Sequence, residues 1–199
     1  MIRKITILFI SCFVALAAIA QTQTFTGMLV GGFNMSQIDG DRLHGFNKLG
    51  LHAGVGVDTR LSERWSLGLE LLFSQQGASM VPRDDISSTY DKIKLNFVEA
   101  PLMIHFRDWK MQASAGVSYG RLVNYEVIND VGSDVSDLEN YRTDIPSILF
   151  GGTYFFHEKW GLNVRWSKYL VSLKKDKDEN SDPVNFHGRT IAVRMFYLL

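Results

Sequence analysis

Apolar residues recur at every second position along most of this chain, and this period of two constrains the fold more than any other feature. The segment 65–74 shows it clearly, with its apolar positions at Trp65, Leu67, Leu69, Leu71 and Phe73. The intervening face carries Ser66, Gly68, Glu70 and Ser74, with Leu72 as an exception. Because successive side chains of a strand point to opposite sides, the segment predicts a β-strand with one apolar face and one small, polar face.

The same alternation divides the chain into eight expected strands: 25–36, 47–61, 64–77, 91–107, 109–123, 144–157, 159–173 and 187–199. Three connections are short, and each is followed at once by a tryptophan: Trp65, Trp109 and Trp160. Four connections are long and polar: 37–46, 78–91, 124–143 and 174–186. Strict alternation of short and long connections is typical of an outer-membrane barrel, with tight periplasmic turns and long outer loops. The three tryptophans are then expected at the inner membrane interface, in an aromatic girdle.

The polar faces of these strands are rich in glycine and serine, which favours a narrow, filled lumen over a solvated surface. The sequence therefore predicts an all-β fold, an eight-stranded antiparallel up-and-down transmembrane β-barrel. The alternation alone leaves one soluble alternative, a periplasmic lipocalin-like barrel that binds a ligand in its cavity. Within the fourth strand, Pro101 cannot donate a backbone hydrogen bond, so a bulge or a locally unpaired position is expected there.

The first twenty residues predict export. Arg3 and Lys4 precede a segment without charges, 5–20, that ends in small residues, the order found in secretory signal peptides. We therefore divide the chain into a signal peptide at 1–20 and an outer-membrane β-barrel domain at 21–199. The alternative of a membrane anchor is disfavoured, because the segment is 16 residues long and a spanning helix needs about 20. Cys12 lies inside this segment, so the exported chain would contain no disulfide or cysteine nucleophile.

Charge balance gives no reason to expect a nucleic acid partner. The chain has 21 basic and 21 acidic residues, and removal of Arg3 and Lys4 would leave an exported chain with a charge of −2. The expected partners are outer-membrane lipid and, through the long loops, other envelope or extracellular proteins. We expect a monomer.

Three segments resemble a known family: Gly31-Gly32-Phe33-Asn34-Met35-Ser36, Leu69-Glu70-Leu71-Leu72-Phe73-Ser74-Gln75-Gln76-Gly77 and Leu95-Asn96-Phe97-Val98-Glu99-Ala100-Pro101-Leu102-Met103. The chain resembles the PorT-like family of small outer-membrane β-barrel proteins. In that family a strand ending in Ser-Gln-x-Gly precedes an aromatic–aliphatic–Glu–apolar–Pro–Leu segment, and Ala100 here stands where isoleucine is more usual. The resemblance covers nearly all of the chain after residue 20 and implies a fold and a bacterial outer-membrane location, without an assigned activity.

The search for catalytic or cofactor chemistry gives little. The five histidines are dispersed without the spacing of metal ligands, and the segment 176–187 begins like a calcium loop but lacks its glycine and its final glutamate. We expect no cofactor and no enzymatic activity. The alternative is an outer-membrane protease or acyltransferase that would use loop residues, of which the candidates are His44, Asp84, Asp85, Ser87 and His187.

Glu70, Arg165 and Arg194 lie on polar faces at similar distances from the expected periplasmic boundary, and we interpret them as a salt-bridged plug of the lumen. A gated ion path is the competing interpretation. Any binding is then expected in the outer loops, above all in 124–143, whose Tyr125, Leu138 and Tyr141 are candidate partner contacts.

Overall fold

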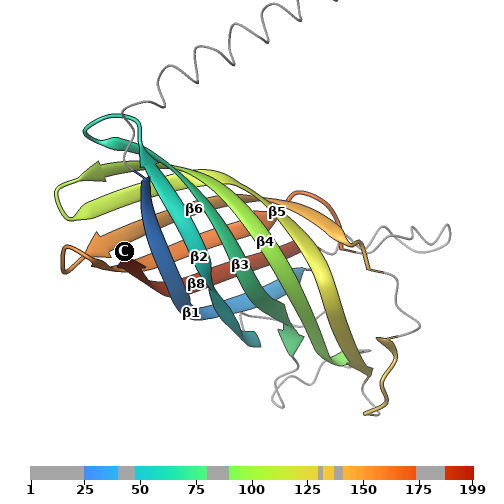
Figure 1. Cartoon of the computed structure of the whole chain (residues 1–199). Helices are drawn as coiled ribbons and strands as arrows, with labels where there is room; N and C mark the ends of the chain where they lie inside the picture. Colours follow the sequence, from blue (N-terminus) through green and yellow to red (C-terminus); the bar gives the residue numbers. More distant parts are fainter. Residues whose placement is uncertain (1–24, 40–47, 80–89, 130–131, 137–140, 174–186) are drawn as a thin grey trace, which may run out of the picture.

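The computed structural model describes residues 25–39, 48–79, 90–129, 132–136, 141–173 and 187–199. Its strands are β1 (Phe25–Asp39), β2 (Lys48–Arg60), β3 (Trp65–Ser79), β4 (Tyr90–Asp108), β5 (Met111–Asn129), β6 (Asp144–Phe155), β7 (Trp160–Tyr169) and β8 (His187–Leu198). Each strand pairs antiparallel with the next, and β8 pairs with β1, so the sheet closes into a barrel (Figure 1). The predicted eight-stranded antiparallel barrel is confirmed. No helix among the described residues is long and apolar enough to cross a membrane.

The fifth strand departs most from its predicted bounds. It begins at Met111, because Trp109 lies in the preceding turn with a φ of 54°, and it continues to Asn129 instead of ending at 123. Asn96 pairs with Asn124 but Phe97 pairs with Leu122, so Val123 is an extra residue. A bulge of this kind disturbs the alternation of faces. The disturbed pattern was wrongly interpreted as the start of a loop.

Pairing between β3 and β4 is interrupted near Pro101. Leu69 pairs with Leu102 and Leu72 pairs with Glu99, but the residues between them are not paired across the two strands. Pro101 has no N–H group to contribute to a ladder. The locally unpaired position that the sequence predicted is confirmed.

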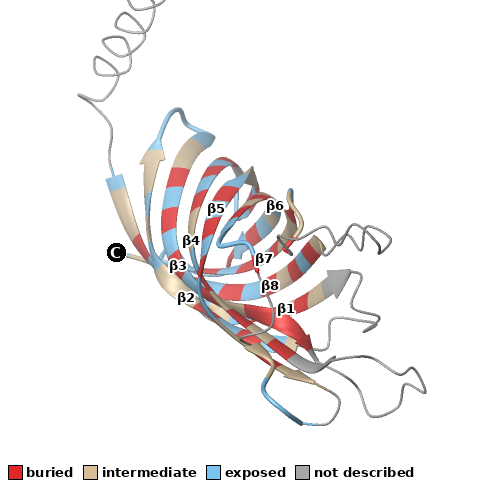
Figure 2. Cartoon of the chain, turned by 90° about the vertical axis from the view of Figure 1, so that its right-hand side faces the viewer, coloured by how far each residue is buried: buried red, intermediate tan, exposed pale blue. Residues whose placement is uncertain are grey.

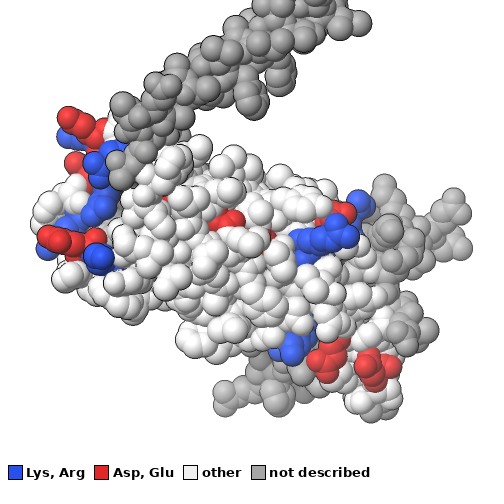
Figure 3. Space-filling view, in the orientation of Figure 1, with Lys and Arg blue, Asp and Glu red and all other residues white. Residues whose placement is uncertain are grey.

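The two faces of the sheet carry different residues, and buried and exposed positions alternate along each strand (Figure 2). Large apolar side chains are exposed on the outer surface; they include Leu29, Phe33, Leu51, Val55, Leu69, Leu71, Phe73, Val98, Leu102, Ile104, Val117, Phe150, Leu162, Val164, Val193 and Met195. On the face seen in Figure 3, charged side chains gather toward the two ends of the barrel, and few lie in the band between. An outward apolar band between two polar ends is the arrangement of a membrane-spanning barrel.

The two ends of the barrel differ. At one end, which we call the turn end, residues 61–64, 109–110 and 156–159 join neighbouring strands. Both ends of the described chain lie there too, since Leu199 N donates to Gly27 O at 2.9 Å. The opposite end is called the loop end. The predicted signal peptide at 1–20 lies outside the described residues.

Candidate functional site in the barrel interior

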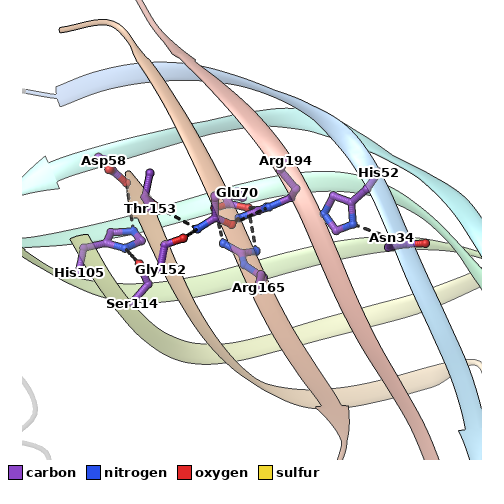
Figure 4. A network of polar contacts seen from close by, with 11 residues as sticks. Asn34, His52, Asp58, Glu70, His105, Ser114, Gly152, Thr153, Arg165 and Arg194 are labelled. Atoms are coloured by element: carbon purple, nitrogen blue, oxygen red, sulfur yellow. Dashed lines mark hydrogen bonds and ion pairs between the residues drawn. The ribbon is translucent and has the colours of Figure 1, made fainter. Parts of the chain in front are cut away.

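Three charged side chains meet in the middle of the lumen (Figure 4). Arg165 Nη1 and Nη2 donate to Glu70 Oε2 and Oε1 at 3.0 and 2.7 Å, and Arg194 Nη1 donates to Oε2 at 2.9 Å. Glu70 comes from β3 and Arg165 from β7, which are separated by three strands in either direction around the barrel. These ion pairs therefore cross the full width of the lumen. We call Glu70, Arg165 and Arg194 the central charge cluster.

Asn163 fixes the second arginine of this cluster. Its Oδ1 accepts hydrogen bonds from Arg194 Nε at 3.0 Å and Nη2 at 2.7 Å, and its Nδ2 donates to Thr153 Oγ1 at 2.9 Å. Arg194 is 0% exposed, and its guanidinium lies 4.9 Å from the centre of the Phe196 ring. Buried charges are costly unless they are paired and hydrogen-bonded. Here Glu70 accepts three hydrogen bonds and Arg194 donates three.

The three segments that resemble the PorT-like family converge beside this cluster. Asn34 Nδ2 donates to Ser74 Oγ at 3.0 Å, and Gln76 Nε2 donates to the same oxygen at 2.9 Å. Gln76 Nε2 also donates to Glu99 Oε1 at 2.5 Å. The motif residues of β1, β3 and β4 are therefore joined in one polar network.

Gly77, the last residue of the second motif, has a backbone that other residues rarely adopt. Its φ is 146°, and a Cβ added there would lie 1.9 Å from Ile93 O on β4. Its N–H donates to Ser36 Oγ at 2.8 Å, and Ser36 Oγ donates to its carbonyl at 2.8 Å. Only glycine allows this close approach of β3 and β4.

A second series of polar contacts lies toward the turn end. Asp58 Oδ1 is 3.5 Å from His105 Nε2, and His105 Nδ1 is 2.7 Å from Ser114 Oγ. Serine hydrolases use this order of Asp, His and Ser. A nucleophile must be reachable by substrate, but Ser114 is 8% exposed and lines neither of the two cavities at this end. The contacts therefore fit a buried polar chain better than a hydrolytic site. Among the described residues, no three His, Cys, Asp or Glu side chains are grouped as a metal site would require.

Toward the loop end the lumen is closed by apolar side chains. We call them the outer apolar cluster, and its members are Ala78, Ile93, Leu95, Phe97, Leu122, Val127, Tyr141, Ile145, Tyr169 and Leu173. Tyr169 connects this cluster to the polar network, because its hydroxyl donates to Gln76 Oε1 at 2.6 Å.

The three tryptophans of the predicted girdle all lie at the turn end. Trp65 and Trp160 are the first residues of β3 and β7, and their rings contact Phe106 at 5.0 Å and Tyr197 at 4.8 Å between centroids. Trp109 lies in the turn between β4 and β5 and is 79% exposed.

The candidate partner residues of the 124–143 segment are placed differently from the prediction. Tyr125 lies in β5 and not in a loop, because the strand continues past the bulge. Tyr141 is buried in the outer apolar cluster, with its ring 5.1 Å from that of Tyr125 between centroids. Burial removes the exposed contact surface that was expected of Tyr141. Leu138 lies outside the described residues, as do His44, Asp84, Asp85 and Ser87.

Gln76 and Glu99 lie in the segments that carry the family resemblance, but their contacts in this interior, and those of His105 and Asn163, were not predicted from the sequence. Gln76 and Asn163 lie on polar faces of their strands, so the alternation gives their inward direction. Glu99 and His105 share the inward face of β4 with several buried apolar side chains, so the alternation of polarity does not single them out. Their partners depend on which residues of distant strands lie at the same depth. The stagger of the strands sets that depth, and no local pattern reveals it.

Comparisons with known proteins agree with this architecture. The family described as "Outer membrane protein beta-barrel domain" matches residues 20–173. The solved structure of Neisserial surface protein A (NspA) shares 12% identity at a TM-score of 0.54, over 89% of this chain and 99% of that chain. Ail, the attachment invasion locus protein of Yersinia pestis, shares 10% identity at a TM-score of 0.50, over 88% and 98%. At such identities the likeness shows the fold alone. No curated protein matches the sequence significantly.

Proposed function

Because the chain belongs to the outer membrane protein beta-barrel domain family, we propose that it is a non-enzymatic, non-conducting barrel that serves as a rigid scaffold for binding at its loop end. Family and fold make it an outer-membrane β-barrel membrane protein. The soluble, lipocalin-like alternative is wrong, because the apolar face points outward and the polar face inward.

The central charge cluster is the observation that carries this proposal. An eight-stranded barrel has an interior only wide enough for its own side chains. Glu70 and its two arginines cross that interior, and the outer apolar cluster fills it nearer the loop end. The lumen is therefore obstructed at two levels. This supports a structural plug and disfavours a gated ion path.

Binding at the loop end is the second element of the proposal. We place the turn end in the periplasm, following the usual orientation of such barrels, so the loop end faces the exterior. Tyr141, in the connection between β5 and β6, packs its ring against that of Tyr125 in β5. The exposed residues Ser133, Asp134 and Arg142 then become the candidate contacts for envelope or extracellular proteins. In this proposal lipid covers the outer surface and the barrel acts as a monomer. The balanced charge of the chain gives no reason to expect a nucleic acid partner.

We also propose that the chain belongs to the PorT-like branch of this family. The support is the junction of its two motifs, in which Gln76 donates to Glu99 and Gly77 lies against the backbone of β4. We further propose that residues 1–20 are a signal peptide that is removed on export. N-terminal sequencing of the membrane-inserted protein should then find Gln21 as the first residue.

Planar-bilayer recording tests the non-conducting scaffold. The purified wild-type barrel should show no steady, porin-sized conductance, and replacing residues 132–136 by a Gly-Ser linker should leave heat-modifiable migration on gels unchanged. The same replacement should abolish cross-links to envelope proteins in intact cells. A large, steady conductance would assign the function to the lumen. Undiminished cross-linking would show that the connection between β5 and β6 does not bind the partner.

The alternative function is that of an enzyme, and the contacts of Asp58 with His105 and of His105 with Ser114 are the observation that favours it. A fluorophosphonate probe should fail to label the wild-type protein. Labelling that Ser114→Ala removes, and that Ser118→Ala on the same strand keeps, would establish a serine hydrolase instead.

A further inference from the structure

A pocket of about 340 Å³ opens at the turn end, beyond the residues that close the lumen. Trp65, Phe155 and Gln112 line it together with three arginines, Arg60, Arg64 and Arg107. Small-molecule sites are concavities of about 300–1,000 Å³ that combine apolar walls with a few placed polar groups. The pocket has both properties.

Two of these arginines lack a carboxylate partner. Arg64 pairs with Asp108 at 3.9 Å, but no ion pair is formed by Arg60 or Arg107 among the described residues. The Arg107 guanidinium lies 4.0 Å from the centre of the Phe155 ring, an arrangement that leaves its in-plane N–H groups available. Arg60 and Arg107 also repel each other electrostatically. A bound anion would relieve this repulsion.

Three acidic residues also line the pocket, Asp58, Glu63 and Glu158, but none of them pairs with Arg60 or Arg107. Asp58 lines it but is engaged with His105 at 3.5 Å on the inner side. Glu63 and Glu158 line it from exposed turns, and neither forms an ion pair with Arg60 or Arg107 among the described residues. Among the described residues, no carboxylate therefore lies within ion-pair distance of Arg60 or Arg107.

The pocket is closed at its inner end. A cavity of about 10 Å³ lies beneath it, bordered by Gln112, His105 and Glu70. Such a space holds about one water molecule at most. A ligand can enter from the turn end but has no path through the lumen.

We propose that this pocket binds a small organic anion, a carboxylate or phosphate attached to an apolar group. Arg60 and Arg107 receive the anionic oxygens, because guanidinium groups match both anions with paired hydrogen bonds. The apolar group lies against Trp65, and the Gln112 amide contacts the buried end. This site is separate from the binding proposed at the loop end. Its existence does not depend on which side of the membrane the turn end faces.

Three matched probes test the site by NMR in detergent micelles: benzoate, phenyl phosphate and the neutral benzamide. We expect saturable shifts of the Arg107 Nε–H and the Gln112 side-chain amide with at least one anion, and none with benzamide. A response to benzoate alone assigns a carboxylate ligand, and a response to phenyl phosphate alone assigns a phosphate. Shifts with benzamide, or with none of the three, would overturn the proposal.

Variants locate the binding. Arg60→Met together with Arg107→Met should weaken it at least tenfold, while Arg142→Met, an exposed arginine at the loop end, should leave it unchanged. The single variant Arg60→Met, which keeps the Arg107–Phe155 contact, covers the case in which the double variant does not fold. Equal weakening by Arg142→Met, or wild-type affinity in Arg60→Met and in any folded double variant, would contradict the site.

Discussion

The interior of the barrel is closed in two physically different ways. The central charge cluster joins β3 to β7 and β8 through paired, hydrogen-bonded charges, whereas the outer apolar cluster fills the loop end by packing. In an apolar cluster each lost side chain costs its own contacts and the cavity it leaves. In a charge cluster the loss of one member leaves the others buried without a partner. The charge cluster is therefore the more sensitive of the two to a single substitution.

The largest expected effect comes from breaking the charge cluster at its shared member. Glu70→Ala should lower the free energy of unfolding by about 3–5 kcal/mol, because it leaves both Arg165 and Arg194 without their carboxylate. Urea titration in lipid vesicles measures the change. A triple variant that adds Arg165→Met and Arg194→Met should recover most of the loss, since it removes the charges altogether. A denaturation midpoint unchanged by Glu70→Ala would show that the cluster does not stabilise the barrel.

The corresponding substitution in the outer apolar cluster should cost less. Leu95→Ala removes a fully buried side chain and should lower the free energy of unfolding by about 2–4 kcal/mol. Its matched control is Leu102→Ala on the same strand, where the side chain is 45% exposed on the outer surface and surrounding lipid can fill the space. Equal losses in the two variants would mean that the cluster is not tightly packed.

The junction of the two regions should show an intermediate response. Gln76→Leu removes the acceptor of the Tyr169 hydroxyl and the donor to Glu99, and should cost about 1–3 kcal/mol through the unsatisfied groups. Gln75→Leu is the control, because Gln75 is half-buried and its amide makes one hydrogen bond, to Asn96. If Gln75→Leu lowered the free energy of unfolding as much as Gln76→Leu, the position of Gln76 between the two regions would add nothing to stability.

An exposed carboxylate gives the smallest effect and shows what burial adds. Hydrogen bonds from the Ser136 hydroxyl, at 2.5 Å, and from its backbone N–H lower the pKa of Asp134. A lowered pKa stabilises the folded form at pH values above the ordinary pKa of Asp, and this contribution disappears as the pH falls through the lowered value. Exchange of the Ser136 amide should therefore accelerate, beyond its intrinsic pH dependence, as acid protonates Asp134. In Asp134→Asn that additional acceleration should be absent, and its persistence would point to another group.

The sequence predicted the local features of the barrel well, because period-two alternation directly reports the face on which a side chain lies. Glu70, Arg165 and Arg194 were recognised as inward charges for this reason. Their pairing was also predicted, from their similar distances to the expected periplasmic boundary. The contacts of Gln76, His105 and Asn163 were not predicted, because the stagger between distant strands decides which side chains meet. The bulge at Val123 interrupts the alternation, so the last six residues of β5 were not predicted as strand. The burial of Tyr141 depends on the path of the connection between β5 and β6, which has no periodic pattern to indicate it.

The order of the strands ties assembly of the barrel to its closure. Glu70 belongs to the third strand, whereas its two arginines belong to the last two. While the C-terminal strands are still unpaired, all three charges need water, and an incomplete sheet in lipid would expose them to hydrocarbon at a high cost. Insertion ahead of closure is therefore disfavoured. The chain should remain in a hydrated state until β8 reaches β1, and neutralisation of the lumen should coincide with the final pairing.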